Sequence, residues 1–263
     1  MTNPSCIRRA IIPAAGKGTR LLPLTKAVPK ELIPLGKRPV LEHVVEECIA
    51  CGIEEIVFVI SSEKEAIRRH FGDSDGKIRF LYAYQHQPLG LAQAIGCARD
   101  FATDEPFAVV LGDSVIASAS SLLPFRRVID TFERTHADAV VLVQPTPREQ
   151  LSRYGVVKPK DTTSSSFEIE DIVEKPLPHE APSIYAVAGR YVFKPFIFDY
   201  IDRTPRGAKG EYQLSDSIRL MIEDGARVWC VALDNNEVRR DIGTFETYFE
   251  ALAFELAKEK VPQ

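Results

Sequence analysis

The stretch of this chain best suited to chemistry is a basic loop with two glycines that directly follows an apolar run. The run over Ile7–Ala14 is typical of a buried strand, and Gly16 and Gly18 come next. Two glycines let the backbone turn tightly, so that successive N–H groups can face an anion. Positive charge is then added to the same segment by Lys17, Arg20, Lys26 and Lys30. This pattern indicates a phosphate-binding site.

The spacing of the glycines excludes two common phosphate loops. The loop lacks the Gly-x-x-x-x-Gly-Lys-Ser/Thr spacing, and Gly16-x-Gly18 lacks the third glycine of the dinucleotide fingerprint. Taken alone, these two glycines are equally compatible with a plain tight turn. The phosphate interpretation therefore depends on Thr19-Arg20 and on Pro29-Lys30-Glu31, which follow them.

Two aspartates stand where a sheet could present them to a ligand. Asp113 follows the apolar run Phe107–Leu111, and Asp241 precedes a glycine turn and a helix. An aspartate in such a position is as often a helix cap or turn residue as a ligand. Carboxylates combined with a phosphate site would nevertheless suit Mg²⁺, which accepts one or two of them together with phosphate oxygens and water.

A glutamine-rich turn offers groups that could read a base. Gln85 precedes a Pro-x-Gly turn that ends at Gly90 and opens a helical pattern. A glutamine carboxamide carries both a donor and an acceptor, as reading the edge of a uracil or thymine ring requires. Gln87 is the alternative reader, and His86 is expected to face solvent.

Hydrophobic periodicity predicts strands that alternate with helices in the first half of the chain. We expect strands at Ile7–Ala14, Ile56–Ile60, Ile78–Tyr84, Phe107–Leu111 and Ala139–Val143, and helices at Val40–Cys51, Lys64–Phe71, Gly90–Phe101 and Leu122–Thr135. Such alternation predicts an α/β fold, with a Rossmann-like, mainly parallel sheet flanked by helices. Ligands of these sheets bind beyond the carboxyl ends of the strands, where the glycine loop comes.

After about residue 144 the rhythm changes to strands separated by polar loops. The pattern predicts strands at Tyr154–Lys158, Phe167–Glu174, Ala186–Phe193 and Val228–Leu233, a solvated hairpin at Asp161–Ser166, and helices at Gln213–Glu223 and Phe245–Lys260. We see no linker or repeat. We therefore predict a single domain over 1–263, with a nucleotide-binding half at about 1–144 and a smaller inserted β-rich portion for a second substrate.

Composition restricts the partners and the compartment. The 263 residues are 45% hydrophobic, so the chain can bury a large core. A net charge of −4 and a pI near 5.8 argue against nucleic acid as a partner. No segment is long and apolar enough for a membrane span, and no secretory pattern opens the chain, so we expect a cytoplasmic protein. The pair Cys48-x-x-Cys51 falls late in a helical pattern, which favours buried helix cysteines over a redox pair.

Taken together, the motifs resemble those of sugar-1-phosphate nucleotidyltransferases. The resemblance is carried by Gly16-Lys-Gly-Thr-Arg20 with Pro29-Lys30-Glu31, by Tyr154-Gly-Val and Glu174-Lys175-Pro, and by Gly189-Arg-Tyr and Asp241-Ile-Gly. Within the family, the Ile-Pro-Ala-Ala-Gly start and the Thr-Lys-Ala-Val-Pro-Lys-Glu run are most similar to the bacterial uridylyltransferases that act on glucose 1-phosphate. The matches span Ile11 to about Tyr248 in family order.

The resemblance implies roles for particular residues. It implies catalytic roles for Arg20, Lys30, Asp113, Lys175 and Asp241. Nucleotide binding is implied for Ala14, Ala15, Gly16, Gly18, Thr19, Arg20, Gln85 and Gly90. Sugar-phosphate binding is implied for Gly112, Gly155, Glu174, Lys175 and Gly189. Mg²⁺ is the implied cofactor, with Asp113 and Asp241 as its ligands, so the half from about 145 to 263 would bind the sugar and complete the metal site. Glu211 and Gln213 would start a helix and support the sugar pocket.

The implied reaction joins UTP and glucose 1-phosphate into UDP-glucose and pyrophosphate, and the resemblance further implies a homo-oligomer. Two observations leave alternatives open. Position 114 is Ser where many relatives have a second Asp, and a helical insert usual after the match to His70-Phe71 is absent. A thymidylyl- or cytidylyltransferase on a related sugar 1-phosphate, and a non-catalytic nucleotide-sugar-binding regulator, therefore remain alternatives.

Overall fold

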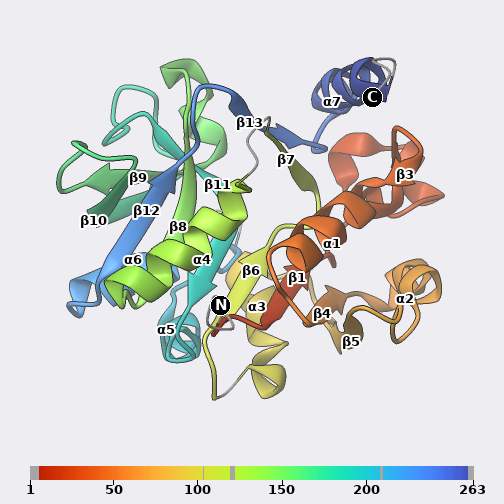
Figure 1. Ribbon diagram of the computed structural model, residues 1–263, viewed down its shortest axis with the longest axis horizontal. Helices are drawn as coiled ribbons and strands as arrows, with labels where there is room; N and C mark the ends of the chain where they lie inside the picture. Colours follow the sequence, from red (N-terminus) through yellow and green to blue (C-terminus); the bar gives the residue numbers. More distant parts are fainter. Residues whose placement is uncertain (1–5, 103, 119–121, 208–209, 260–263) are drawn as a thin grey trace.

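A nine-stranded mixed sheet organises the computed structural model, which describes residues 6–102, 104–118, 122–207 and 210–259 (Figure 1). The strand order is β5-β4-β1-β6-β11-β8-β12-β10-β9. The strands are β1 (Arg9–Pro13), β4 (Glu55–Ile60), β5 (Arg79–Tyr84), β6 (Phe107–Val110), β8 (Ala139–Pro145), β9 (Gly155–Pro159), β10 (Ser166–Glu174), β11 (Tyr185–Phe193) and β12 (Val228–Ala232). The predicted α/β class is confirmed.

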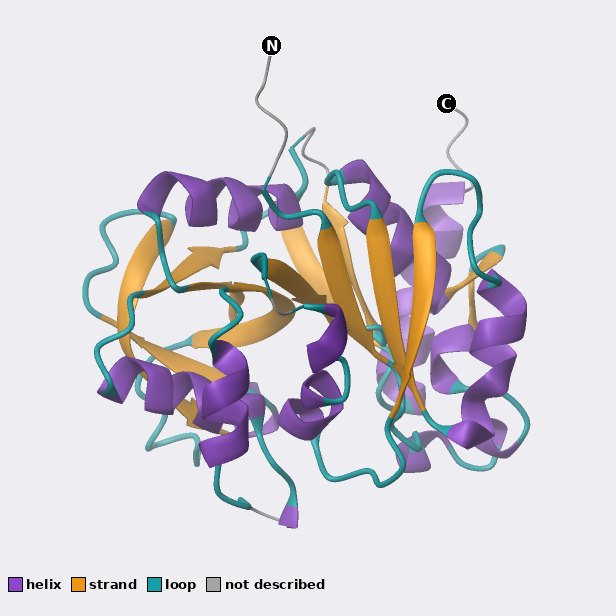
Figure 2. Ribbon diagram, turned by 90° about the horizontal axis from the view of Figure 1, so that it is seen from below, coloured by secondary structure: helices purple, strands orange, loops and turns teal. Residues whose placement is uncertain are grey.

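Helices cover both faces of this sheet (Figure 2). One face packs on α3 (Leu91–Gly96), α5 (Ile197–Arg203) and α6 (Leu214–Glu223), and the other on α1 (Val40–Ala50), α2 (Glu65–Phe71) and α4 (Pro124–Thr135). Side chains alternate between the faces along each strand, so Ile11 of β1 enters the first core and Ile12 the second. The loops that follow the strands are therefore anchored to a sheet that packs between two layers of helices. None of the described helices is long and apolar enough to cross a membrane.

The sheet is parallel in its first half and mixed in its second. Strands β5, β4, β1 and β6 run parallel to one another. Strand β11 then pairs antiparallel with both β6 and β8, and β10 pairs antiparallel with β12 and β9. The parallel sheet expected from the sequence therefore forms the first half, because βαβ alternation stops near residue 144. The second half keeps the parallel pair of β8 with β12 among antiparallel pairs. The expected turn at Asp161–Ser166 joins the antiparallel strands β9 and β10.

Four features of the fold differ from the prediction. Strands β7 (Ser114–Ser118) and β13 (Glu237–Asp241) form a separate two-stranded sheet, as do β2 (Pro34–Leu35) and β3 (Arg38–Pro39). Helix α5 was also missed, and α3 ends at Gly96 before a short 3₁₀ turn at Arg99–Phe101. The β7–β13 pair matters most, because its register places Asp241 opposite Ser114, the neighbour of Asp113.

The C-terminal helix and the α2–β5 connection complete the fold. Helix α7 (Phe245–Glu259) packs against β13 and β2. The connection after Phe71 is a short turn in which Asp75 accepts hydrogen bonds from the N–H groups of Lys77 and Ile78.

Candidate active site

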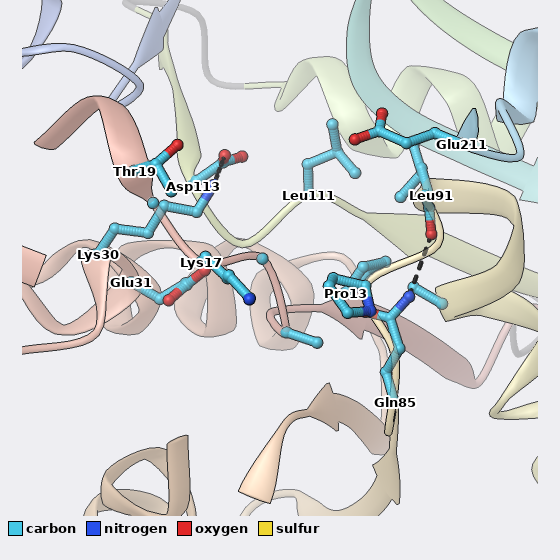
Figure 3. A pocket seen from close by; sticks show the side chains of 16 residues that line it. Pro13, Lys17, Thr19, Lys30, Glu31, Gln85, Leu91, Leu111, Asp113 and Glu211 are labelled. Atoms are coloured by element: carbon cyan, nitrogen blue, oxygen red, sulfur yellow. Dashed lines mark hydrogen bonds and ion pairs between the residues drawn. The ribbon is translucent and has the colours of Figure 1, made fainter. Parts of the chain in front are cut away.

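A cavity of about 460 Å³ opens where β1, β5 and β6 end, and the glycine loop forms one wall of it (Figure 3). From the loop come Ala15, Gly16, Lys17, Gly18 and Thr19. Lys30, Gln85, Gly90, Leu111, Asp113 and Glu211 also line it. Of the residues implied for nucleotide binding, Ala14 is buried behind this wall, and Arg20 lines a neighbouring cavity instead.

The glycine loop is built as its sequence requires. Gly18 has a φ of +66°, and a Cβ there would come within 3.0 Å of Thr25 Cγ2. Thr25 Oγ1 donates a hydrogen bond to the Gly18 carbonyl at 3.0 Å, which fixes the turn. A Cβ on Gly16 would lie 3.9 Å from Nζ of Lys30. The loop and the later lysine therefore form one positively charged wall.

Lys30 and Asp113 form an ion pair across the cavity, with 2.5 Å between Nζ and Oδ2 (Figure 3). Burial alone would raise the pKa of Asp113, but the Lys30 ammonium outweighs it and holds that pKa below its usual range. Burial likewise opposes the charge of Lys30, whereas Asp113 raises its pKa. Both groups therefore stay charged at neutral pH.

A second, more deeply buried pair lies beneath the loop and was not predicted. Lys64 Nζ donates to Glu31 Oε2 and to the Ala14 carbonyl, both at 2.7 Å. The side chains are 8% and 2% exposed. Burial raises the pKa of Glu31 and lowers that of Lys64. The Pro-Lys-Glu segment thus presents Lys30 to the cavity while Glu31 anchors the segment beneath it.

Gln85 lies at the far end of the same cavity, at 5% exposure. Its Nε2 donates to the Gly90 carbonyl at 3.2 Å and to Gln93 Oε1 at 2.5 Å. Gln87 and His86 are exposed and do not line the cavity, so Gln85 is the better placed of the two glutamines. Glu211 lines this cavity as well, and Gln213, which precedes α6, donates from Nε2 to Glu211 Oε2 at 3.1 Å.

A second cavity of about 740 Å³ shares Leu111 and Asp113 with the first. Arg20, Tyr154, Arg239 and Asp241 also line it. A Cβ on Gly243 would lie 3.2 Å from Nη2 of Arg20, so this arginine reaches the turn after Asp241. The two cavities therefore meet at Asp113.

Asp241 is held against Asp113 by the backbone and by two side chains. The Ile242 N–H donates to the Asp113 carbonyl at 2.9 Å. Tyr154 Oη donates to Asp241 Oδ2 at 3.2 Å, and Arg239 Nη2 donates to the same oxygen at 2.5 Å. The Arg239 guanidinium also lies 4.1 Å from the centre of the Tyr154 ring. Burial, and then the charge of Asp113, raise the pKa of Asp241.

Arg239 was missed in the sequence. Within Glu-Val-Arg-Arg-Asp, two adjacent arginines resemble an ordinary charged surface strand, and only the pairing of β13 with β7 turns one of them toward Asp241.

The donor set at the junction suits a divalent cation. No group of three or more His, Cys, Asp or Glu side chains that could hold a metal occurs among the described residues. Two carboxylates completed by substrate phosphate oxygens and water are, however, a set that Mg²⁺ accepts. Burial is the largest cause that raises the pKa of Asp241 and the charge of Asp113 adds to it, so a cation bound beside both carboxylates would offset both effects. Asp113 and Asp241 therefore fit the implied metal.

Three of the residues expected around the sugar phosphate, Gly155, Glu174 and Lys175, form a group that lines neither of these two cavities. Lys175 has a φ of +47° and pairs with Glu174, whose other oxygen accepts from Ser215 Oγ at 2.8 Å. A Cβ on Gly155 would lie 2.6 Å from that hydroxyl. Their neighbour Tyr154 does line the larger cavity.

The other two glycines in that expectation pack against protein groups. A Cβ on Gly189, which has a φ of +79°, would come within 3.0 Å of Leu111, the side chain shared by both cavities. A Cβ on Gly112 would meet Ile12 and Leu41 at 3.1 Å, so Gly112 has a packing role between β1 and α1.

Comparison with known proteins gives a consistent assignment. The nucleotidyl transferase family model matches residues 9–258. A UTP–glucose-1-phosphate uridylyltransferase of Bacillus subtilis is 39% identical over 259 residues, which covers 90% of this chain and 87% of the relative. A crystal structure of a UDP-glucose pyrophosphorylase complexed with UDP-glucose superposes with a TM-score of 0.87 at 30% identity, covering 96% of this chain and 99% of that one.

A structure with a lower TM-score is named for transfer of a thymidylyl group. A putative glucose-1-phosphate thymidylyltransferase from Bacillus anthracis superposes with a TM-score of 0.80 at 27% identity, over 97% of this chain and 96% of that one. The resemblance inferred from the motifs is confirmed: the chain belongs to the nucleotidyl transferase family.

Proposed function

We propose that this enzyme transfers the uridylyl group of UTP to glucose 1-phosphate, giving UDP-glucose and pyrophosphate. One observation carries the proposal. Two cavities meet at Asp113, the first with the cationic glycine loop and Gln85, the second with Arg20 and Asp241. Two substrates can therefore meet at one carboxylate. The relatives named as uridylyltransferases and the pyrophosphorylase solved with UDP-glucose support this choice of substrates.

The reaction is a direct displacement at phosphorus. A phosphate oxygen of glucose 1-phosphate forms a bond to the α-phosphorus of UTP, and the bond from that phosphorus to the β-phosphate bridging oxygen breaks with release of pyrophosphate. The attacking oxygen is already anionic, so no enzyme nucleophile is required. Catalysis then consists of positioning and charge neutralisation.

The cationic groups divide the phosphates of UTP between them in this proposal. Lys30, which points into the first cavity, neutralises the α-phosphate region. Arg20 and the backbone N–H groups of Gly16 and Gly18 hold the β- and γ-phosphates. Lys64 and Glu31 keep the loop and Lys30 in place, and Gln85 with the Gly90 backbone reads the uracil edge.

We propose Mg²⁺ as the cofactor, with Asp113 and Asp241 as its protein ligands. When bound, it neutralises charge that develops on the α-phosphate oxygens. Asp113 and Asp241 would have to release Lys30 and Arg239 in part, and the freed ammonium and guanidinium groups would then face the substrate phosphates.

The sugar phosphate is assigned to the second half of the chain. In this proposal Lys175 holds its phosphate, Glu174 accepts from hexose hydroxyls, and Gly155 and Gly189 allow close approach to the backbone. Gly112 also belongs to this proposed sugar-phosphate set, because it directly precedes Asp113. This set is supported by its proximity to Tyr154 and Leu111, which line the larger cavity.

The proposal also covers the compartment and the oligomeric state of the protein. We place the enzyme in the cytoplasm, which is supported by its nucleotide substrate and by five unpaired cysteines. A homo-oligomer is supported by the exposed apolar side chains Phe249 and Leu256 on α7.

The test is to incubate the protein with Mg²⁺ and glucose 1-phosphate, supply UTP, dTTP or CTP, and identify the nucleotide sugar by chromatography. We expect UDP-glucose to form fastest. Faster turnover of dTTP or CTP would retain the mechanism and change the substrate. Binding of UTP without any product, for glucose 1-phosphate and a panel of other sugar phosphates, would support the non-catalytic regulator instead.

A further inference from the structure

Gln85 belongs to a chain of hydrogen bonds that fixes which end of its carboxamide the base meets. The chain runs from the Gly90 carbonyl to Gln85, from Gln85 to Gln93 on α3, and from Gln93 to Cys97 one turn later. Nothing in the reaction itself requires Gln93, which lines neither of the two cavities. Its hydrogen bond to Gln85, the proposed base reader, instead points to a role in nucleotide specificity.

The first hydrogen bond, to the Gly90 carbonyl, determines which atom of each side chain donates and which accepts. A backbone carbonyl can only accept, so the atom of Gln85 that faces Gly90 O at 3.2 Å must be Nε2. The same Nε2 donates to Gln93 Oε1 at 2.5 Å. Both N–H bonds of the carboxamide are then committed. Oε1, a pure acceptor, is left for the base.

The far end of the chain supports the same orientation. Gln93 must present its oxygen to Gln85, so its own Nε2 points the other way and donates to Cys97 Sγ at 3.3 Å. Among the described residues, no group donates to Gln85 Oε1, although Gln85 lines the cavity and is 5% exposed. The only open hydrogen-bonding position of this side chain is therefore an acceptor.

An acceptor-only reader placed opposite ring position 3 distinguishes pyrimidines by the atom there. Uracil and thymine carry an N–H donor there, whereas cytosine carries a lone pair. We infer that Gln93 is a positioning residue for nucleotide specificity: by occupying the second N–H of Gln85, it holds Oε1 toward the base and so favours UTP over CTP. This inference rests on the proposed assignment of the base to the Gln85 cavity.

In the absence of an acceptor at position 93, the second N–H of Gln85 loses its partner while the first stays on the Gly90 carbonyl, so the carboxamide should turn about that bond and offer the freed N–H to the lone pair of cytosine. In Gln93→Met the side chain keeps its length but cannot accept, whereas in Gln93→Glu a carboxylate still accepts from Gln85. Gln87→Met is the matched control, because Gln87 is exposed on the same segment and lies outside the cavity.

The experiment measures equilibrium binding of UTP and CTP by calorimetry, and then kcat/KM for both, in the wild type and the three variants. We expect the UTP-to-CTP ratio to fall about 10- to 100-fold in Gln93→Met, the factor expected for one buried hydrogen bond. Gln93→Glu and Gln87→Met should keep the wild-type ratio. A loss of equal size for both nucleotides in Gln93→Met would show a merely structural role and overturn the inference.

The two measurements separate this inference from the proposed function. Preferential UTP binding that depends on Gln93, without any turnover, would retain the inference and remove the uridylyltransferase assignment. Equal binding of UTP and CTP by the wild type would overturn the inference even if UDP-glucose is formed.

Discussion

At the scale of single residues, Asp113 is the point on which the site depends, since it lines both cavities and pairs with Lys30. The sequence predicted it from its place after an apolar run. It could not predict Arg239 or Lys64, because a charged side chain becomes recognisable as buried only when its partners arrive from distant segments.

Asp113→Asn should lower kcat for UDP-glucose formation by at least about 100-fold, because one preorganised charge at a reaction centre has an effect of that order. The fold should persist, since the substitution preserves shape. Steady-state rates and circular dichroism measure both quantities. Asp100→Asn, on an exposed 3₁₀ turn, is the control. Near-normal activity in Asp113→Asn would contradict the assignment of Asp113 as a metal ligand.

The cysteines give a prediction about pH. Burial, and then Glu47, raise the pKa of Cys51 from 9.0 to about 12, and burial raises those of Cys48 and Cys230 as well. Thiols react as thiolates, so at pH 8 a disulfide reagent should leave these three untouched in the folded enzyme and label all five cysteines in denaturant. Rapid labelling of Cys48 or Cys51 in the folded protein would revive the redox interpretation.

The same shift has a consequence for stability. Because the folded pKa of Cys51 lies above the ordinary value, its contribution is fully present below pH 9.0 and is lost as pH rises toward about 12. Unfolding midpoints measured across this range should therefore decline. The unfolding midpoint should decline less steeply with pH in Cys51→Ala, because the substitution removes the titrating thiol.

At the scale of elements, the predicted strands and helices agree best where side chains follow a regular hydrophobic period. β4, β8, α1 and α4 lie within two residues of their predicted bounds. β7 and β13 were missed because they pair only with each other and β13 is almost entirely charged. Their pairing nevertheless brings Asp241 to Asp113, so the part of the site that depends on it could not be derived from periodicity.

The 3₁₀ segment at Lys30–Leu32 depends on the buried Glu31–Lys64 pair. Lys64→Met leaves Glu31 buried without a counterion, which should destabilise the protein by about 3 to 5 kcal/mol. Urea unfolding measures this. The control is Lys158→Met, which breaks an exposed pair with Glu170 and should cost less than about 1 kcal/mol. Equal losses in the two variants would refute an anchoring role for Lys64.

Gly90 joins the base-reading turn to the segment before α6. It has a φ of +111°, and a Cβ there would lie 2.5 Å from the Tyr212 carbonyl oxygen. Gly90→Ala should therefore shift this turn and weaken UTP binding at least about 10-fold, roughly 1.4 kcal/mol. In Gly76→Ala the φ is also positive but nothing lies within 4 Å, so this control isolates backbone strain. Calorimetric titration with UTP distinguishes the two, and unaltered affinity in Gly90→Ala would contradict the geometry.

At the scale of the whole molecule, the two halves meet in one sheet and two shared cores. The core with α3, α5 and α6 contains residues as far apart as Ile11 and Val228. This continuity supports our proposal of a single domain over 1–263, with the nucleotide half at about 1–144. The family and its fold followed from motif order along the chain. The junction of the cavities did not, since it depends on how the end of β6, the start of β7 and the end of β13 come together.

The central claim is that glucose 1-phosphate attacks UTP directly at the junction of the two cavities. The stereochemical course at the α-phosphorus tests this most directly, with UTP made chiral there by a sulfur substituent and the configuration of the thio-UDP-glucose determined afterwards. One in-line displacement inverts the configuration, so we predict clean inversion. Retention would require two displacements through a covalent enzyme intermediate, and would contradict a site without an enzyme nucleophile.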